Sequence, residues 1–493
     1  MSRPGAGDPP GEGQVHPTLD DPVVASLSEG VGGPMGSRAG RHRWWTPAAV
    51  LLVLTGVAMA LGMLQKTPCY TDTWSDGQVR YSAMCYSDLP YLYTGRGMVE
   101  RTWPYSDDPQ VRDRFEVMEY PVGISYWAWG TAWVTHALVG MPDLEDRYDR
   151  DPGALFSDPA VQREIRGYVI VNALGFALLA LLAVWLLARV NPGRPWDAAA
   201  VAVSPALVLT GLVNWDLLAV ACVAGALWAW SRDRPVLTGV LIGLGTAAKL
   251  YPLFLLGGVL VLCARRRRWR ELALASAAAA VAWLVTNAPA YLSGRDEWLV
   301  FWGFNSDRGA DLGSIWLVVS QATDTVIDPG TINDVSAVFF LAWCLGVAVI
   351  GWLAPSPPRL AQLGFLVVVG FLLVNKVYSP QYVLWLLPLA VLARPRWRDQ
   401  LVWQGTEVLY VASVWWYLGG YLAPGSGDDA GFYWLAIVVR MLGELYLVVL
   451  VVRDVLRPAH DPVPREASWE VDPGQPRGAP VPPVGATPGG RVS

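Results

Sequence analysis

Apolar runs of helical length recur along almost the whole chain and constrain its fold more than any other feature. A helix needs roughly 20 apolar residues to cross the hydrocarbon core of a bilayer. Hydrophobic residues make up 53% of the 493 residues, which is typical of membrane proteins. The sequence therefore predicts an all-α polytopic membrane protein. We predict about 12 transmembrane helices, near residues 45–65, 167–188, 197–213, 215–230, 235–248, 253–264, 272–291, 335–353, 361–374, 381–393, 400–421 and 432–452.

The arginines set the predicted orientation of these helices. Cytoplasmic loops of membrane proteins carry an excess of Lys and Arg. If the first helix starts inside and the helices alternate, five loops that each contain arginine fall in the cytoplasm, and both termini are cytoplasmic. These loops are 189–196, 231–234, 265–270, 394–399 and 453–457. The same alternation leaves residues 66–166 as a large first extracytoplasmic loop.

Residues 119–140 form one further apolar segment that is long enough to span. If it did, the downstream loops would exchange sides, and the cluster from Arg265 to Arg270 would be exported. We therefore interpret it as a re-entrant or interfacial helix within the first extracytoplasmic loop. The predicted transmembrane domain covers residues 44–457. Residues 1–43 and the Pro-rich residues 458–493 are predicted to be disordered cytoplasmic tails.

Lysine is rare in this chain, and its placement suggests a function. Of the 37 basic residues only Lys66, Lys249 and Lys376 are lysines. Lys249 precedes Leu-Tyr-Pro, and Lys376 precedes Val-Tyr-Ser-Pro, each within apolar sequence where charge is costly. A compact ammonium suits phosphate binding, whereas arginine offers a planar fork. The alternative is that both side chains extend to a nearby membrane interface.

Two of the five cysteines, Cys69 and Cys85, fall in the predicted first extracytoplasmic loop. A disulfide between them would close the start of this loop in an oxidising compartment. The alternative is a pair of free thiols. The chain shows no Cys/His spacing typical of a metal site, so no metal is predicted and a divalent-ion requirement stays open.

Several short phrases occur in an order that resembles one enzyme family. Asp88-Leu89 follows the first predicted helix, and Tyr120-Pro121 opens the apolar segment. The phrases Asn214-Trp215-Asp216, Lys249 to Pro252 and Lys376 to Tyr382 follow downstream. Over about residues 45–452 this order resembles GT-C membrane glycosyltransferases, and within them the bacterial polyprenyl-phosphate-mannose-dependent α-mannosyltransferases. Val122 departs from the family pattern, which often has a second proline there.

The resemblance implies a GT-C-like fold and an inverting hexosyl- or pentosyltransferase. The sugar would be mannose, or alternatively a pentose, carried by a polyprenyl-phosphate donor. The acceptor would be a glycolipid or a cell-envelope glycan on the outer face of the cell membrane. No cofactor and no nucleic-acid partner are expected. The competing hypothesis is a lipid-linked sugar transporter or flippase, which would also contain broken helices and intramembrane charge.

The resemblance also implies roles for individual residues. Asp88 would be the general base, with Glu119 as the alternative base. Lys249 and Lys376, with Tyr251 and Tyr378, would bind the donor phosphate. Further candidates for substrate binding are Glu119, Tyr120, Asn214, Asp216, Gln381 and Arg308.

Three of these candidates also have simpler interpretations. Glu119 could pair with Arg96 or Arg101, and Asp216 could cap the helix that follows it. Arg308 could be solvated in its loop.

Overall fold

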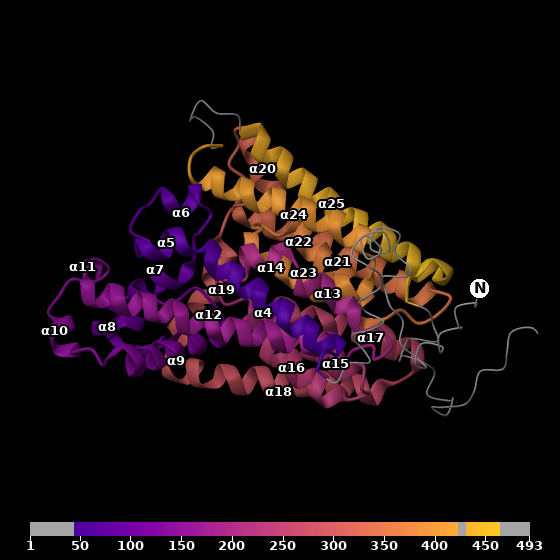
Figure 1. The fold of residues 1–493 in the computed structure, drawn as a ribbon. Helices are drawn as coiled ribbons and strands as arrows, with labels where there is room; N and C mark the ends of the chain where they lie inside the picture. The colour runs from indigo at the N-terminus through magenta and orange to yellow at the C-terminus, as the bar shows by residue number, and fades with distance from the viewer. Residues whose placement is uncertain (1–43, 423–429, 464–493) are drawn as a thin grey trace, which may run out of the picture.

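The computed structural model describes residues 44–422 and 430–463 (Figure 1). All the regular secondary structure within these residues is helical. The first long helix is α4 (Pro47–Gln65), and Thr46 caps its start by accepting a hydrogen bond from Ala49 N. The polypeptide between α4 and the next long helix folds into short helices and one longer one. These are α5 (Thr67–Thr71), α6 (Val79–Ser82), α7 (Asp88–Gly95), η1 (Met98–Glu100), α8 (Pro109–Arg114), α9 (Val122–Val139), α10 (Leu144–Tyr148) and α11 (Pro152–Leu155).

The remaining helices form one elongated bundle. Its first half contains α12 (Pro159–Leu187), η2 (Pro195–Ala198), α13 (Ala199–Ala202), α14 (Pro205–Thr210), α15 (Leu217–Trp230), α16 (Pro235–Ala248), η3 (Tyr251–Phe254), α17 (Leu255–Arg266) and α18 (Trp269–Ser293). Its second half contains α19 (Arg295–Asp307), α20 (Ile315–Ala322), α21 (Pro329–Leu353), α22 (Leu360–Val374), η4 (Pro380–Tyr382), α23 (Val383–Ala393), α24 (Trp397–Leu418), α25 (Ala430–Leu456) and η5 (Pro458–His460).

Each predicted apolar run except 197–213 overlaps one described helix closely, but not all of these helices are long enough to span. Five meet the length and hydropathy expected of a membrane span, namely α4, α12, α18, α21 and α25. A polytopic membrane protein follows from these five. The predicted number of 12 stays a prediction, because α15 and α16 have 14 residues each. Such a helix rises about 21 Å, less than the hydrocarbon thickness of about 30 Å.

Proline determines where the predicted segment 197–213 is interrupted. The residue before a proline disfavours helical geometry, and Ser204, which precedes Pro205, is extended. The Ser204 hydroxyl then accepts a hydrogen bond from Leu207 N and starts α14. The segment therefore consists of η2, α13 and α14 rather than one continuous helix.

Burial separates the centre of the bundle from its surface. Every residue of α23 is buried, as are all but two of α22. In contrast, only 17% of the most apolar window of α18 and 11% of that of α21 are buried. Apolar helices this exposed are stable in lipid rather than in water. We infer that α18 and α21 face the lipid, whereas α22 and α23 form the core.

Two glycines bring α16 into backbone contact with α18. A Cβ added at Gly239 would lie 2.1 Å from Ala275 O, and one at Gly243 would lie 2.3 Å from Ala279 O. Small residues four apart allow this close approach between membrane helices. The contact fixes the position of the last turn of α16, which ends next to Lys249.

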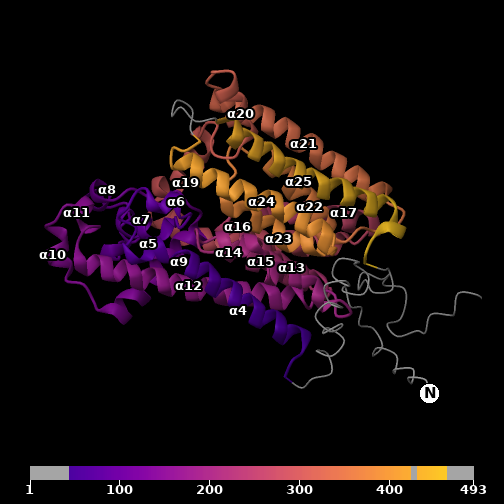
Figure 2. The ribbon, with the colours of Figure 1, turned by 45° about the horizontal axis from the view of Figure 1, so that its top comes forward.

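The connecting loops lie at the two ends of the bundle, and contacts join the loops at each end. At one end, Arg232 donates to Arg189 O, Arg268 pairs with Asp233, and Arg394 pairs with Asp454. These arginines all lie in loops predicted to be cytoplasmic. At the other end, Asp88 N donates to Val213 O, which joins the first loop to the start of α15. Figure 2 shows α5 to α11 gathered at this second end. The assignment of each end to a side of the membrane stays a prediction.

The first loop is anchored at its start and crossed by α9. Cys69 and Cys85 form a disulfide in the structure, with their Cα atoms 5.7 Å apart. Helix α9 is continuous and packs against α12 and α16, with Gly123 in contact with Ala247 O. It is absent from the five candidate spans, and a re-entrant or interfacial placement stays a prediction.

The predicted tails fall largely outside the described residues. Residues 1–43 lie outside them, as does 458–493 apart from 458–463. Those six residues contact the bundle, because Asp461 pairs with Arg359 and the His460 carbonyl accepts from Arg394.

We predict that residues 141–165 are extracytoplasmic. Ser157 is exposed in this segment, so a cysteine placed there in a background without free cysteines should be accessible. A membrane-impermeant maleimide should label it in intact cells. Labelling that appears only after lysis would contradict this topology.

Candidate active site

Asp88 is held at the start of α7 by two short connections to the loop before α15. Ser87 caps α7, and its hydroxyl also donates to Leu212 O at 3.0 Å. The backbone N–H of Asp88 donates to Val213 O at 2.8 Å. A residue at the first turn of a helix is well suited to carry negative charge. These bonds place the Asp88 carboxylate against the segment that contains Asn214 and Asp216.

A chain of polar side chains leads from Asp88 into the bundle. The Tyr120 hydroxyl donates to Asp88 Oδ2 at 2.6 Å, and Asn214 Nδ2 donates to the Tyr120 oxygen at 3.2 Å. Asn214 Oδ1 in turn accepts from the backbone N–H of Asp216 at 3.1 Å. Four residues that the sequence singled out, from three distant segments, therefore meet in one network.

Asp216 joins this network to Lys249. The Lys249 ammonium lies 3.0 Å from Asp216 Oδ1, and Trp385 Nε1 donates to Asp216 Oδ2 at 2.8 Å. Asp216 is 1% exposed and precedes α15, but its side chain makes no capping hydrogen bond. The helix-cap interpretation of Asp216 is therefore wrong. A buried carboxylate of this kind requires a charged partner, and Lys249 supplies it.

Aromatic rings surround the Lys249 ammonium. It lies 4.7 Å from the centre of the Tyr120 ring and 5.8 Å from those of Tyr382 and Trp385. Tyr251 stacks on Trp385 at 4.7 Å between ring centres, so it supports the wall and is not placed against the ammonium. The faces of aromatic rings attract cations. The side chain of Lys249 keeps 12% exposure, so an anion could still reach it.

The surroundings of Asp88 act on its proton affinity in opposite directions. Burial raises the pKa of Asp88 above its ordinary value, and hydrogen bonds from Tyr120 and Tyr86 together with the charge of Lys249 oppose this rise in pKa. Burial also lowers the pKa of Lys66 to about 7, against the attraction of Asp88. Lys66 is 1% exposed and donates to Tyr86 O at 2.8 Å. A second lysine is therefore buried within electrostatic range of the candidate base.

Lys376 and Arg308 form a separate group. The Lys376 ammonium donates to the carbonyls of Asn305 at 2.8 Å and Ser306 at 3.2 Å, and Arg308 pairs with Asp311. The structure thus gives Lys249 and Lys376 different partners, although both follow the end of an apolar helix. Tyr378 points away from this group, since its hydroxyl donates to the buried Glu407 at 3.0 Å.

The remaining sequence candidates have other surroundings. Glu119 pairs with Arg96, as its simpler interpretation predicted, and Arg96 also lies 3.2 Å from Glu116. Gln381 is 5% exposed, and its Oε1 has no hydrogen-bond partner among the described residues.

Sequence reasoning missed Lys66, Tyr382 and Trp385 as members of the site. The available signals were the rarity of lysine, the place of Tyr382 at the end of the second lysine phrase, and Trp385 three residues later.

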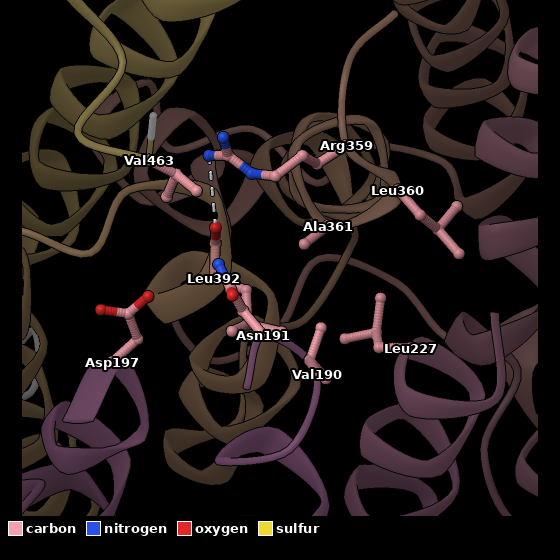
Figure 3. A pocket seen from close by; sticks show the side chains of 9 residues that line it. All are labelled: Val190, Asn191, Asp197, Leu227, Arg359, Leu360, Ala361, Leu392 and Val463. Atoms are coloured by element: carbon pink, nitrogen blue, oxygen red, sulfur yellow. Dashed lines mark hydrogen bonds between the residues drawn. The ribbon is translucent and has the colours of Figure 1, made fainter. Parts of the chain in front are cut away.

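Two other features bear on what the molecule can bind. Within residues 44–422 and 430–463, no three His, Cys, Asp or Glu side chains gather as a metal-ligand group. A cavity also lies at the arginine-rich end, shown in Figure 3. Its lining includes Asn191, Asp197 and Arg359, and Arg359 is already engaged with Asp461 and with the carbonyls of Leu392 and Ala393.

One comparison with known proteins bears on the activity of this site. Residues 153–375 match the model of glycosyltransferase family 87. The matched segment begins within α11 and ends just after α22, so it contains Asn214, Asp216 and Lys249 but not Asp88. The match, with the apolar helices, indicates a membrane glycosyltransferase. No curated protein matches the chain.

The hydrogen bond from Tyr120 to Asp88 predicts a pH effect. It stabilises the charged carboxylate and so opposes the raised pKa of Asp88. Tyr120→Phe should raise this pKa further, so that the carboxylate is protonated at higher pH. In a plot of transfer rate against pH at saturating donor, the acid limb should then shift to higher pH by about one unit. Tyr148→Phe, at an exposed loop tyrosine, is the control. An unchanged acid limb in Tyr120→Phe would show that Asp88 does not govern it.

Proposed function

We propose that this protein transfers a sugar from a polyprenyl-phosphate donor to a glycolipid or cell-envelope glycan acceptor on the outer face of the membrane. The sugar is mannose, or alternatively a pentose. The observation that carries the proposal is the network from Asp88 through Tyr120, Asn214 and Asp216 to Lys249. It joins a carboxylate and a cation in a chain whose residues 153–375 match a glycosyltransferase family, which supports the proposal.

Asp88 acts as the general base in this proposal. The acceptor hydroxyl attacks the anomeric carbon, the bond from that carbon to the phosphate oxygen breaks, and the hydroxyl proton passes to Asp88. Tyr120 donates to Oδ2, Tyr86 also donates a hydrogen bond to this carboxylate, and the carboxylate accepts the proton of the attacking hydroxyl. Attack on the face opposite the phosphate inverts the configuration.

Lys249 stabilises the leaving group. The electron pair of the broken bond remains on the polyprenyl phosphate, so negative charge develops there. An ammonium has three N–H donors, and Lys249 can hold Asp216 and a phosphate oxygen at the same time. Lys376 and Arg308 provide a second cationic region, and we propose that it contacts the donor or the acceptor further out.

Replacing Asp88 by asparagine should slow transfer at least about 10²-fold without loss of donor binding. The amide keeps the size and polarity of the side chain but cannot accept the proton. Asp113→Asn is the matched control, because Asp113 is an exposed carboxylate of the same loop. Single-turnover rates and donor affinity should be measured for both variants. A wild-type rate in Asp88→Asn, or an equal loss in Asp113→Asn, would remove Asp88 as the base.

Replacing Lys249 by methionine should weaken donor use by about 2–3 kcal/mol, through loss of a charge-assisted contact. This variant leaves Asp216 buried and unpaired, which can destabilise the fold. The double variant Lys249→Met with Asp216→Asn removes both charges and should restore thermal stability but not donor use. Normal donor use in the folded double variant would show that Lys249 serves only to neutralise Asp216.

The decisive assay for the function itself is reconstitution. Purified protein should be incubated with synthetic polyprenyl-phospho-mannose, the corresponding pentose donor and a panel of membrane glycolipids, and products should be identified by mass spectrometry. A new glycosidic bond supports the proposal. Movement of the labelled donor between bilayer leaflets without a new bond would instead identify a flippase.

A further inference from the structure

An aromatic cavity adjoins the candidate active site. It lies where the start of α9 meets the ends of α16 and α18 and the helix α19. Its wall includes Tyr105, Tyr120, Leu250, Trp283, Trp298 and Trp302. Two of these residues belong to the site or border it: Tyr120 donates to Asp88, and Leu250 follows Lys249 directly. The cavity therefore begins next to both the candidate base and the candidate phosphate-binding cation.

Several polar groups of the cavity wall are already paired within the protein. Trp298 Nε1 donates to Asn287 Oδ1 at 2.8 Å, and Asn287 Nδ2 donates to Trp283 O at 2.9 Å. The Tyr105 hydroxyl donates to Ser125 Oγ at 3.1 Å. The wall consists mostly of aromatic and aliphatic side chains, so it offers an occupant mainly apolar contact. A sugar ring, which needs hydrogen bonds from the site that holds it, does not suit such a wall.

The outer side of the cavity continues into apolar surface. Trp302, Leu299 and Leu292 are 38%, 40% and 82% exposed, and they lie on α19 and at the end of α18. Helix α18 is among the helices with the most exposed apolar surface, so the cavity opens toward the region occupied by lipid. An apolar chain could thus run from the bilayer along this surface to the vicinity of Lys249.

We propose that this cavity binds the isoprene units of the polyprenyl donor that are nearest to its phosphate. The inference rests on the proposed function and adds the subsite that distinguishes a polyprenyl donor from a soluble one. A ligand with an anionic head and an apolar chain matches a cation flanked by an aromatic cavity. Tyr120 joins the two parts, because its ring lines the cavity while its hydroxyl holds Asp88. The occupied cavity therefore holds this ring in place, and with it the hydrogen bond to the base.

Chain-length dependence of the transfer reaction tests the proposal. Two donors carry the same phospho-mannose, one on a long polyprenyl chain and one, the short-chain donor, on a methyl group that has no isoprene unit to fill the cavity. Wild-type protein should use the long-chain donor with the lower KM. Trp302→Ala should raise KM for the long-chain donor about tenfold, with little change for the short-chain donor, because the lost ring contacts only the chain. Trp352→Ala removes an exposed tryptophan of α21 and should change neither value.

The outcomes separate the two proposals. If wild-type protein transfers sugar from neither donor, the proposed function fails. If wild-type protein is active but Trp302→Ala keeps the full preference for the long chain, the cavity is not the donor subsite. If Trp302→Ala instead raises KM only for acceptor lipids with long chains, the cavity binds the acceptor and the proposal is overturned.

A second measurement needs no variant and no activity. Polyprenyl phosphate with a photoreactive diazirine in its second isoprene unit should cross-link wild-type protein within residues 246–250 or 283–302. Excess unlabelled polyprenyl phosphate should suppress this labelling. Cross-links confined to other helices would overturn the proposal, even if Trp302→Ala fails to fold.

Discussion

The buried ion pair between Lys249 and Asp216 is the interaction on which the candidate site depends. Asp216 is 1% exposed, so the free energy of leaving either charge unpaired would be large. The pair joins the start of α15 to the end of α16, and Trp385 of α23 holds the second oxygen of Asp216. Three helices are therefore positioned by one carboxylate. The aromatic rings around Lys249 and the polar chain to Asp88 are built on this arrangement.

The Lys249 ammonium also helps to hold the first loop against the bundle, through Tyr120. Tyr120 contacts both the candidate base and the candidate phosphate-binding cation. Its hydroxyl donates to Asp88, and its ring faces the Lys249 ammonium. The disulfide between Cys69 and Cys85 closes the loop three residues before Asp88. The disulfide thus ties the start of the loop to the segment that carries Asp88, and Tyr120 holds the loop at the site by a hydrogen bond and a cation–ring contact. Each attachment limits the movement of a carboxylate that lies outside the long helices.

Much of the fold followed from the sequence, because it is governed by local properties. Apolar length located most of the helices, and Pro205 explains the interruption between α13 and α14. The pairing of Lys249 with Asp216 could not be predicted, since the two residues lie in different segments and only the packing of α15 against α16 brings them together. The similar phrases at Lys249 and Lys376 gave no indication that the two ammonium groups have different partners. The roles of Tyr382 and Trp385 were hidden for another reason, as aromatic residues are common throughout this chain.

The contact of Gly239 and Gly243 with α18 has a consequence for how the site can vary. Side chains between two helices can change rotamer and absorb a substitution, but a contact between backbones has no such freedom. The distance between α16 and the part of α18 that lines the aromatic cavity is therefore fixed by the backbone. Substitutions elsewhere in the core can tilt the pair of helices together without changing their separation. Diversity in the shape of this region must then arise from the side chains that line it, such as those of α19.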